Sequence, residues 1–387
     1  MRSRPLWAGH DIVDSDRVAR VGEYPTRICA AVFTMEVSCM MTYSSHKASL
    51  RKAKEIAAHA ICAGVVSMGL GSLALAQGGA NSFAVLSSSD VTLKNRVNVN
   101  PPNVLPGDCP GAVGCPGSVG GATVLMGRGN AAAPDTISGD VVASADSSQG
   151  LNCSNNPPGT TSICLGNDSE VAGTCVTGGT AVSSPSECAA GTDTTGTNLE
   201  VTTLLPKAIS DAASFSSSLA AMPPTQVLPA IVLGTRGSTT ISSGGALNVV
   251  RLPSITSGTR STIILNGAPT DIFVINVGSS TDAGSLQVGN NASVLLTGGI
   301  TPDHVIFNLI GAGTTAQLGN HTVFNGTILA AQGQFTSGDG DTPNPVLIDG
   351  SLLFGGSIAI GNNTNLNFYP FGGVGGGGGT TSSVPTS

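Results

Sequence analysis

Three aspartates in a Gly-rich segment are the clearest local candidates for metal chemistry. Asp339, Asp341 and Asp349 lie within S-G-D-G-D-T-P-N-P-V-L-I-D-G. Clustered carboxylate and backbone oxygens suit Ca²⁺, which takes about six to eight oxygen ligands. The spacing departs from an EF-hand because Pro343 occupies the next ligand position, and the tandem nonapeptide of Ca²⁺-binding β-rolls is missing. The segment predicts either an acidic, solvated turn, which we favour, or a calcium site; no other cofactor is indicated.

Residues for catalysis are scarce. After residue 76 the histidines are His304 and His321, and both neighbour turn residues. Nucleophilic catalysis needs a Ser or Cys, a base and an orienting acid, and the G-x-S-x-G elbow is missing. No two Asp or Glu residues have a local spacing that predicts the paired carboxylates of a sugar-cleaving enzyme. The sequence predicts a protein that is not an enzyme, in which both histidines hydrogen-bond at turns.

The cysteines indicate an oxidising compartment. Six of the nine fall in one window, 105–190: Cys109, Cys115, Cys153, Cys164, Cys175 and Cys188. An even number in an exported chain is typical of disulfides, and six allow about 15 connectivities. A metal site is the alternative, but the window has no histidine and no C-x-x-C. We therefore expect three disulfides.

An export signal is the best-defined local pattern. Within 47–76, a basic cluster precedes an uncharged apolar run that ends at Ala74-Leu75-Ala76, so cleavage is expected before Gln77. A single membrane anchor is the alternative, but glycines dilute the run. We expect residues 1–46 to be a misassigned start or disordered, with translation starting at Met35, Met40 or Met41. The predicted location is extracellular or on the cell surface of a bacterium, reached by the general secretory route, with no membrane span in the mature chain.

The composition after Ala76 excludes some partners. Seven Lys and Arg stand against 17 Asp and Glu, which gives a net charge of −10. Nucleic acids and anionic membranes need a basic surface, so neither is expected as a partner. Recurring Val, Ile, Leu and Phe in the C-terminal half argue against disorder.

Short apolar units interrupted by Gly, Asn or Asp fill the stretch from Val227 to Phe371. They predict a parallel β-solenoid (β-helix), with a β-sandwich as runner-up. One α-helix is predicted over Pro206–Met222, with an apolar stripe that docks on the solenoid. The all-β domain should span 77–371. We interpret 105–190 as a disulfide-rich loop insertion, with short strands expected near Ala122–Met126 and Thr136–Ala143. Residues 372–387 are interpreted as a flexible tail rich in Gly, Ser and Thr.

Two segments carry a resemblance to a known family. Val305–Phe335, with N-G-T-I-L-A, and Ile348–Phe371, ending in Y-P-F, resemble the choice-of-anchor A family of bacterial surface proteins. The opening F-A-V-L-S-S-S-D-V-T-L is similar to the first strand of ice-binding-like β-helix domains. The resemblance covers roughly 83–100 and 206–371 and leaves out the cysteine window. It implies an extracellular β-helix on a linker to a surface anchor, and it transfers no catalytic residues.

Three functions follow from these patterns. The leading hypothesis is a non-enzymatic surface or extracellular protein for adhesion, attachment or matrix structure, with an unidentified surface, matrix or polysaccharide ligand. The alternative is a secreted ice-binding protein, whose partner is ice; Thr239-Thr240, Thr314-Thr315 and Thr322 form no regular T-x-T ladder in the sequence. The third is a secreted polysaccharide-active protein.

Overall fold

The computed structural model describes residues 83–100 and 203–372, together with nine strands between residues 118 and 193. The chain divides into two units, 1–57 and 58–387, and all described residues belong to the second. The segments 1–46 and 47–76, the predicted cleavage site at Ala74, Ala76 and Gln77, and the tail beyond Gly372 lie outside the described residues.

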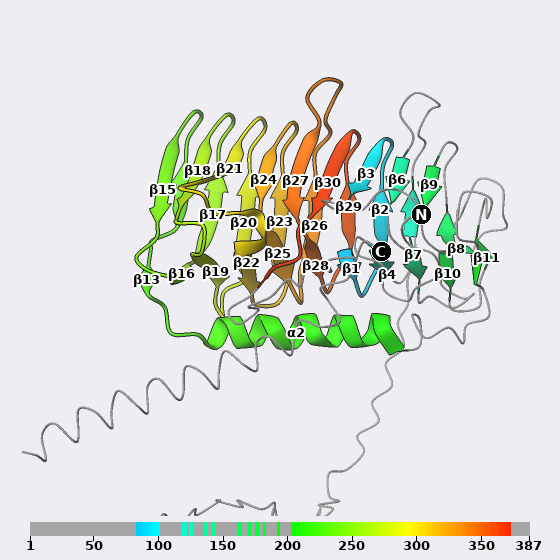
Figure 1. Cartoon of the computed structure of the whole chain (residues 1–387), viewed down its shortest axis with the longest axis horizontal. Coiled ribbons are helices and arrows are strands. Elements are labelled where there is room, and N and C mark those ends of the chain that lie inside the picture. Colours follow the sequence, from blue (N-terminus) through cyan, green and yellow to red (C-terminus); the bar gives the residue numbers. More distant parts are fainter. Residues whose placement is uncertain are drawn as a thin grey trace, which may run out of the picture. The chain divides into compact units, whose positions relative to one another are not determined.

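The described strands form three parallel sheets, which we call A, B and C (Figure 1). Sheet A contains, in spatial order, β12 (Thr192–Asp193), β10 (Cys175–Thr177), β7 (Val141–Ala143), β4 (Ser118–Gly121), β1 (Phe83–Ser87), β28 (Leu352–Phe354), β25 (Thr327–Ala330), β22 (Val305–Ile310), β19 (Ile272–Gly278), β16 (Leu247–Leu252) and β13 (Gln226–Val227). Sheet B contains β11 (Ala181–Val182), β8 (Thr161–Cys164), β5 (Val124–Met126), β2 (Val91–Leu93), β29 (Ile358–Ile360), β26 (Gln334–Ser337), β23 (Thr315–Leu318), β20 (Ser285–Val288), β17 (Ser254–Ser257) and β14 (Ile231–Leu233). Sheet C contains β15 (Ser238–Ser242), β18 (Thr262–Asn266), β21 (Ser293–Thr297), β24 (Val323–Asn325), β27 (Val346–Gly350), β30 (Thr364–Phe368), β3 (Val97–Asn100), β6 (Asp135–Ile137) and β9 (Ser169–Val171). The predicted parallel β-solenoid is confirmed.

The coils do not stack in sequence order. The first coil, β1 to β3, lies between the coil of β4 to β6 and the last coil, β28 to β30. The chain continues outward to β12, and the helix α2 (Leu205–Ala221) then connects to β13 at the opposite end. Coils from β16 onward return stepwise until β28 pairs with β1. The first and last coils of the domain are therefore neighbours.

The cysteine window is not a loop insertion. Eight strands, β4 to β11, lie between Ser118 and Val182 and extend all three sheets. Short strands were expected only near Ala122–Met126 and Thr136–Ala143, where β5, β6 and β7 are found. The other segments were not recognised, because strands of two to four residues are too short to show periodicity. A neighbouring coil supplies the hydrogen-bond partners that such short segments cannot supply alone. Cys164 and Cys175 are buried in this part, and the other four cysteines lie outside the described residues.

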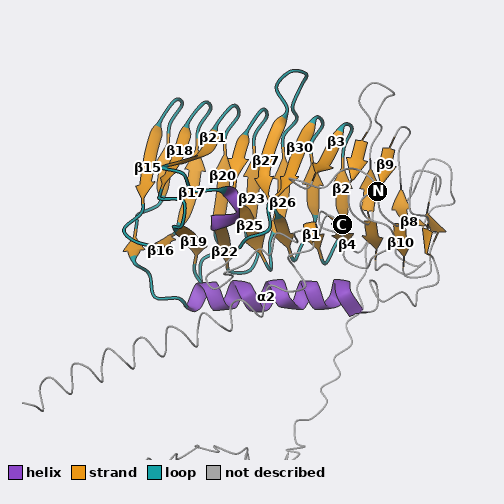
Figure 2. Cartoon of the chain, in the orientation of Figure 1, coloured by secondary structure: helices purple, strands orange, loops and turns teal. Residues whose placement is uncertain are grey.

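Helix α2 covers the outer side of sheet A (Figure 2). Its 17 residues span about 25 Å, which matches roughly five strands spaced about 4.8 Å apart. The predicted stripe is confirmed at Ala208, Ala212, Phe215 and Leu219, which are buried with outward residues of sheet A such as Ile306. Apolar burial on this side therefore fixes the helix along the stack.

Two buried asparagines join α2 to sheet A and were not anticipated from the sequence. Asn308 of β22 donates to the Ser216 carbonyl at 3.0 Å and to Asn276 Oδ1 at 2.8 Å, while Ser216 Oγ donates to Asn308 Oδ1 at 2.6 Å. Asn276 of β19 donates to the Leu219 carbonyl at 2.8 Å. Helix carbonyls near a C-terminus lack intrahelical partners or share them, so these amides fix the position of the helix end.

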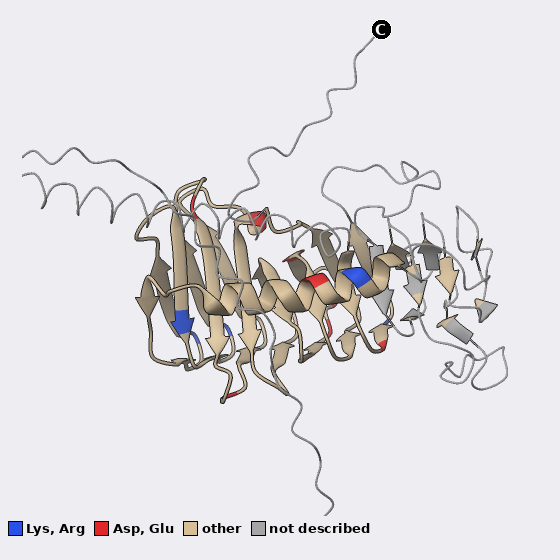
Figure 3. Cartoon of the chain, turned by 90° about the horizontal axis from the view of Figure 1, so that it is seen from below, with Lys and Arg blue, Asp and Glu red and all other residues tan. Residues whose placement is uncertain are grey.

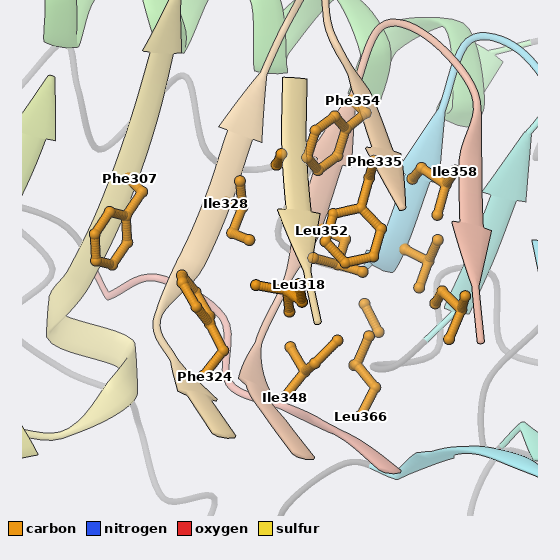
Figure 4. Close-up of a cluster of buried hydrophobic side chains, with 14 of the residues drawn as sticks. Phe307, Leu318, Phe324, Ile328, Phe335, Ile348, Leu352, Phe354, Ile358 and Leu366 are labelled. Carbon is orange, nitrogen blue, oxygen red and sulfur yellow. The ribbon is translucent and has the colours of Figure 1, made fainter. Parts of the chain in front are cut away.

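The interior between the sheets is apolar. Alternate residues of each strand point inward, and successive coils stack apolar side chains on apolar side chains (Figure 4). Phe307 and Phe324 pack with ring centroids 5.1 Å apart, and Phe335 and Phe354 with centroids 5.5 Å apart. This core leaves the outward residues of sheets B and C free of any packing role.

Candidate functional site

The outer side of sheet B carries two straight files of side chains, which we call face B. The inward neighbours of these residues, such as Leu286, Leu318 and Phe335, are buried in the core, so the residues between them point outward. Strand register aligns the first file through consecutive coils: Val232, Thr256, Gln287, Gln317, Thr336, Ala359 and Thr92. The second file contains Ser254, Ser285, Thr315 and Gln334.

Face B is a regular array of uncharged groups. Its members repeat about every 4.8 Å across the strands and about 6.6 Å along each strand. None is Asp, Glu, Lys or Arg, in keeping with the few charged positions on the described solenoid (Figure 3). None of the hydroxyls and amides in the two files hydrogen-bonds to another described side chain or backbone group. The array can therefore offer all its polar groups to a ligand.

The other two outer surfaces are unlike face B. The outer side of sheet A is covered along its middle strands by α2. On the outer side of sheet C, which we call face C, polar groups bond to one another: Asn98 Nδ2 donates to Asn365 Oδ1 at 2.9 Å, and Asn367 Nδ2 donates to Asp349 Oδ1 at 2.7 Å. Face C therefore also carries a charged group, the half-buried carboxylate of Asp349. Only face B, among the described surfaces, is regular, uncharged and without internal hydrogen bonds.

The threonines that the sequence drew attention to are dispersed. Thr239 and Thr240 lie on β15 of sheet C, whereas Thr315 belongs to face B. Thr314 and Thr322 are buried, and Thr322 Oγ1 donates to the Gly319 carbonyl at 2.8 Å. Face B is built mainly from glutamine, serine and other threonines, so no local T-x-T pattern could reveal it.

Asp339 belongs to a ladder of side chains at the corners between sheets B and C. Each Asn or Asp side-chain oxygen accepts the backbone N–H of the corresponding residue in the next coil. The steps join Asn290 to Asn320 at 2.9 Å, Asn320 to Asp339 at 2.9 Å, Asp339 to Asn362 at 2.9 Å and Asn362 to Asn95 at 3.1 Å. The ladder satisfies backbone donors that turn away from the sheets. Asp339 thus has a structural role that the sequence did not predict.

The other two aspartates have partners of their own. His321 Nδ1 donates to the Asn344 carbonyl at 2.7 Å, and its Nε2 lies 3.8 Å from Asp341 Oδ2. Asp349 lies on β27, where burial raises the pKa of its carboxyl. The described residues contain no group of three His, Cys, Asp or Glu side chains arranged for a metal ion. The structure does not group Asp339, Asp341 and Asp349, and calcium binding stays a prediction.

His321 follows the expectation of a turn histidine. It has φ of 55° at a corner between sheets B and C, and Arg236, Arg260 and Asn291 occupy the same left-handed position in other coils. His304 ends the 3-10 helix η4 (Pro302–His304), and its Nδ1 is buried without a hydrogen-bond partner in the described structure. Among the described contacts, neither imidazole is hydrogen-bonded to a serine or cysteine that could act as a nucleophile.

The Asp339 ladder predicts a dependence of stability on acid. The hydrogen bond from the Asn362 backbone, with a smaller contribution from Lys94 at 3.3 Å, lowers the pKa of Asp339 below its ordinary value of 3.8. A lowered folded-state pKa stabilises the fold above the ordinary value, and this stabilisation is lost as pH falls through the folded-state pKa. Asp339→Asn keeps the acceptor oxygen, so its unfolding midpoint should vary less with pH below 3.8 than that of the parent.

Asp339→Ala serves as the comparison, because it leaves the Asn362 N–H without its partner. It should lower the free energy of unfolding by about 0.5–1.5 kcal/mol at neutral pH, toward the low end since the Asp339 side chain is half exposed. Urea unfolding of both variants at several pH values measures the two effects. Equal acid sensitivity in the Asn variant and the parent would show that another group is responsible.

Comparison with known proteins identifies the fold family. The Ice-binding-like family matches residues 120–365, and the match includes most of the cysteine window. No curated protein matches this chain. A match to the choice-of-anchor A family is not found among these comparisons, so that resemblance stays a hypothesis.

Several solved structures are similar to this chain. An ice binding protein from an Antarctic Biological Consortium has 17% identity and a TM-score of 0.43, covering 76% of this chain and 90% of that one. An ice-binding protein from Antarctomyces psychrotrophicus has 15% identity and a TM-score of 0.43, covering 75% and 96%. The DUF3494 domain of Shewanella frigidimarina ice-binding protein_1 has 14% identity and a TM-score of 0.43, covering 76% and 96%.

Among the described residues, no helix is both long and apolar enough to cross a bilayer.

Proposed function

Because this chain belongs to the Ice-binding-like family, we propose that it binds ice through face B. The observation that carries the proposal is the uncharged, regularly spaced array of Thr, Ser, Gln and Ala, whose polar groups have no partners within the described chain. A crystal is a periodic ligand, so a periodic surface gains one contact for each repeat. Because the core holds face B rigid, little conformational entropy is lost on binding.

Charge explains why face B is preferred to face C. An ionised group binds its hydration water strongly and must lose part of it against a solid surface, which costs free energy. Face B contains no ionisable side chain, whereas face C carries Asp349 and an extended network of paired amides. We infer that the protein acts by binding and performs no reaction.

Thermal hysteresis of the purified protein tests this function. We expect a concentration-dependent gap between melting and freezing temperatures, together with faceted ice crystals. The same buffer with an equal concentration of an unrelated acidic β-protein is the control. A freezing point equal to that of the control, at concentrations where the protein is folded by circular dichroism, would exclude ice binding.

We also propose that the protein is exported, with cleavage after Ala76, and that its six cysteines form three disulfides. The pattern of residues 47–76 supports the first part. For the second, Cys164 and Cys175 are both buried in the coils. The intact mass of the exported protein, with and without reduction, tests both parts. A mass that includes residues upstream of residue 60, or six alkylatable thiols before reduction, would contradict them.

A further inference from the structure

A polar groove lies beside the corner between sheets B and C, away from face B. The segment 338–345, between β26 and β27, rises above the neighbouring turns as the orange loop of Figure 1. Beneath it is a cavity of about 300 Å³, at the lower end of the range for ligand pockets. The side chains that line it and enter the argument are Arg96, Asn98, Asp341, Pro343, Asn363 and Asn365.

Backbone geometry brings these groups together from distant parts of the sequence. Arg96 and Asn363 occupy the left-handed position of adjacent coils, with φ of 58° and 49°. Arg96 Nη1 donates to Asn363 Oδ1 at 3.4 Å, and Asn363 Nδ2 donates to the Gly340 carbonyl at 3.0 Å. The second bond ties the projecting loop to the coil, so the groove has two fixed walls.

Hydrogen-bonding capacity remains in the groove. The described structure gives no further bond to Asn365 Nδ2 or to the other guanidinium nitrogens of Arg96. Asp341 is 62% exposed, and its Oδ1 accepts only a long bond of 3.4 Å from the Asn344 backbone. Donors and acceptors on planar groups therefore line the same cavity.

We propose that this groove binds a neutral saccharide. Planar amide, carboxylate and guanidinium groups can each make two hydrogen bonds to adjacent hydroxyls of a sugar ring. One cation and one anion balance, which favours an uncharged ligand over a phosphate or uronate. Pro343 offers an apolar wall for the C–H side of the ring.

Face C, next to the groove, carries further amide and carboxylate side chains of the same kind. Outward from Asn365 and Asn98 on face C, a second file of polar side chains runs through Asp349, Asn367 and Asn100 in consecutive coils. Asp349, Asn367 and Asn100 would extend the contact from the groove to further units of a chain, so the ligand class is a polysaccharide. The proposal does not rest on ice binding, because the groove and face B lie on different surfaces of the solenoid.

Affinity electrophoresis of the full chain tests the proposal, with dextran, mannan and laminarin as neutral probes and alginate as the acidic one. We expect retardation by at least one neutral polysaccharide. Asp341→Ala changes an exposed loop side chain and should weaken binding about tenfold, the effect of losing one or two hydrogen bonds to a ligand. Gln317→Lys on face B is the matched control and should bind the polysaccharide like the parent.

Three results would overturn the proposal. These are the absence of retardation by all three neutral probes, stronger retardation by alginate than by any of them, and equal binding by Asp341→Ala and the parent. Arg96→Asn, which keeps a residue tolerant of positive φ, gives an independent check from the other wall. Because the assay contains no ice, its failure would leave the thermal-hysteresis result unaffected.

Discussion

Replacing Gln317 by Lys is expected to lower the affinity for ice about tenfold or more. Gln317 lies in the middle of face B, between Gln287 and Thr336 in the adjacent coils. An ammonium group there must lose part of its hydration against a solid surface, and a cost of about 1.4 kcal/mol already corresponds to tenfold weaker binding. The side chain is exposed and outside the core, so the fold should be unaffected.

The same charge placed on face C separates the site from a general effect of charge. Leu295 of β21 is 38% exposed on the outer side of sheet C, and Leu295→Lys should keep the thermal hysteresis of the parent. Both variants should have the circular dichroism and unfolding midpoint of the parent. Equal loss of activity in the two variants, or full activity in Gln317→Lys, would place ice binding elsewhere.

Phe335→Ala is expected to lower the free energy of unfolding by about 3–5 kcal/mol, the largest effect on stability that we predict. Phe335 is 1% exposed, packs against Phe354 and aligns with Ala316 and Ile358 in the adjacent coils. Removing the ring leaves a cavity that rigid parallel coils cannot close. The loss is a large part of the roughly 5–15 kcal/mol that stabilises a typical domain.

The neighbouring residue provides the control for this substitution. Thr336 is on the same strand, points outward and belongs to face B. Thr336→Ala should change stability by about 0.5 kcal/mol or less. Chemical unfolding followed by circular dichroism compares the two. Similar destabilisation by both variants would mean that the inward and outward sides of β26 are not as described.

Regular, long elements were predictable from the sequence, and short ones were not. The helix was expected at Pro206–Met222 and is found at Leu205–Ala221, because its apolar stripe and flanking prolines are local signals. The parallel solenoid after Val227 was also predicted. In the cysteine window, strands were expected only near Ala122–Met126 and Thr136–Ala143, and the others were missed, since a two-residue strand such as β11 exists only through its neighbour β8.

The candidate sites depend on register, which one sequence does not reveal. Gln287, Gln317 and Thr336 are ordinary exposed residues until strand pairing places them in one file. The Asn290, Asn320 and Asp339 ladder arises in the same way, one residue per coil. Asp339 and Asp341 were identified by type and spacing, but their hydrogen bonds to Asn362 and Asn344 come from coils or turns that a local pattern cannot place.

The insertion of the first coil between the last coil and the cysteine-containing coils has a kinetic consequence. The backbone of Asn95 bonds to the side chain of Asn362, 267 positions later, and β3 pairs with β30 along its whole length. Contacts between such distant residues form slowly, because a long loop must close before they are made. During synthesis, β1 to β3 can pair with β4 to β6 early, but their partners on the other side, β28 to β30, are made last. The stack of β1 to β12 and the stack that begins at β13 can each form early. The two stacks join only when β28 to β30 have been made and the chain is almost complete.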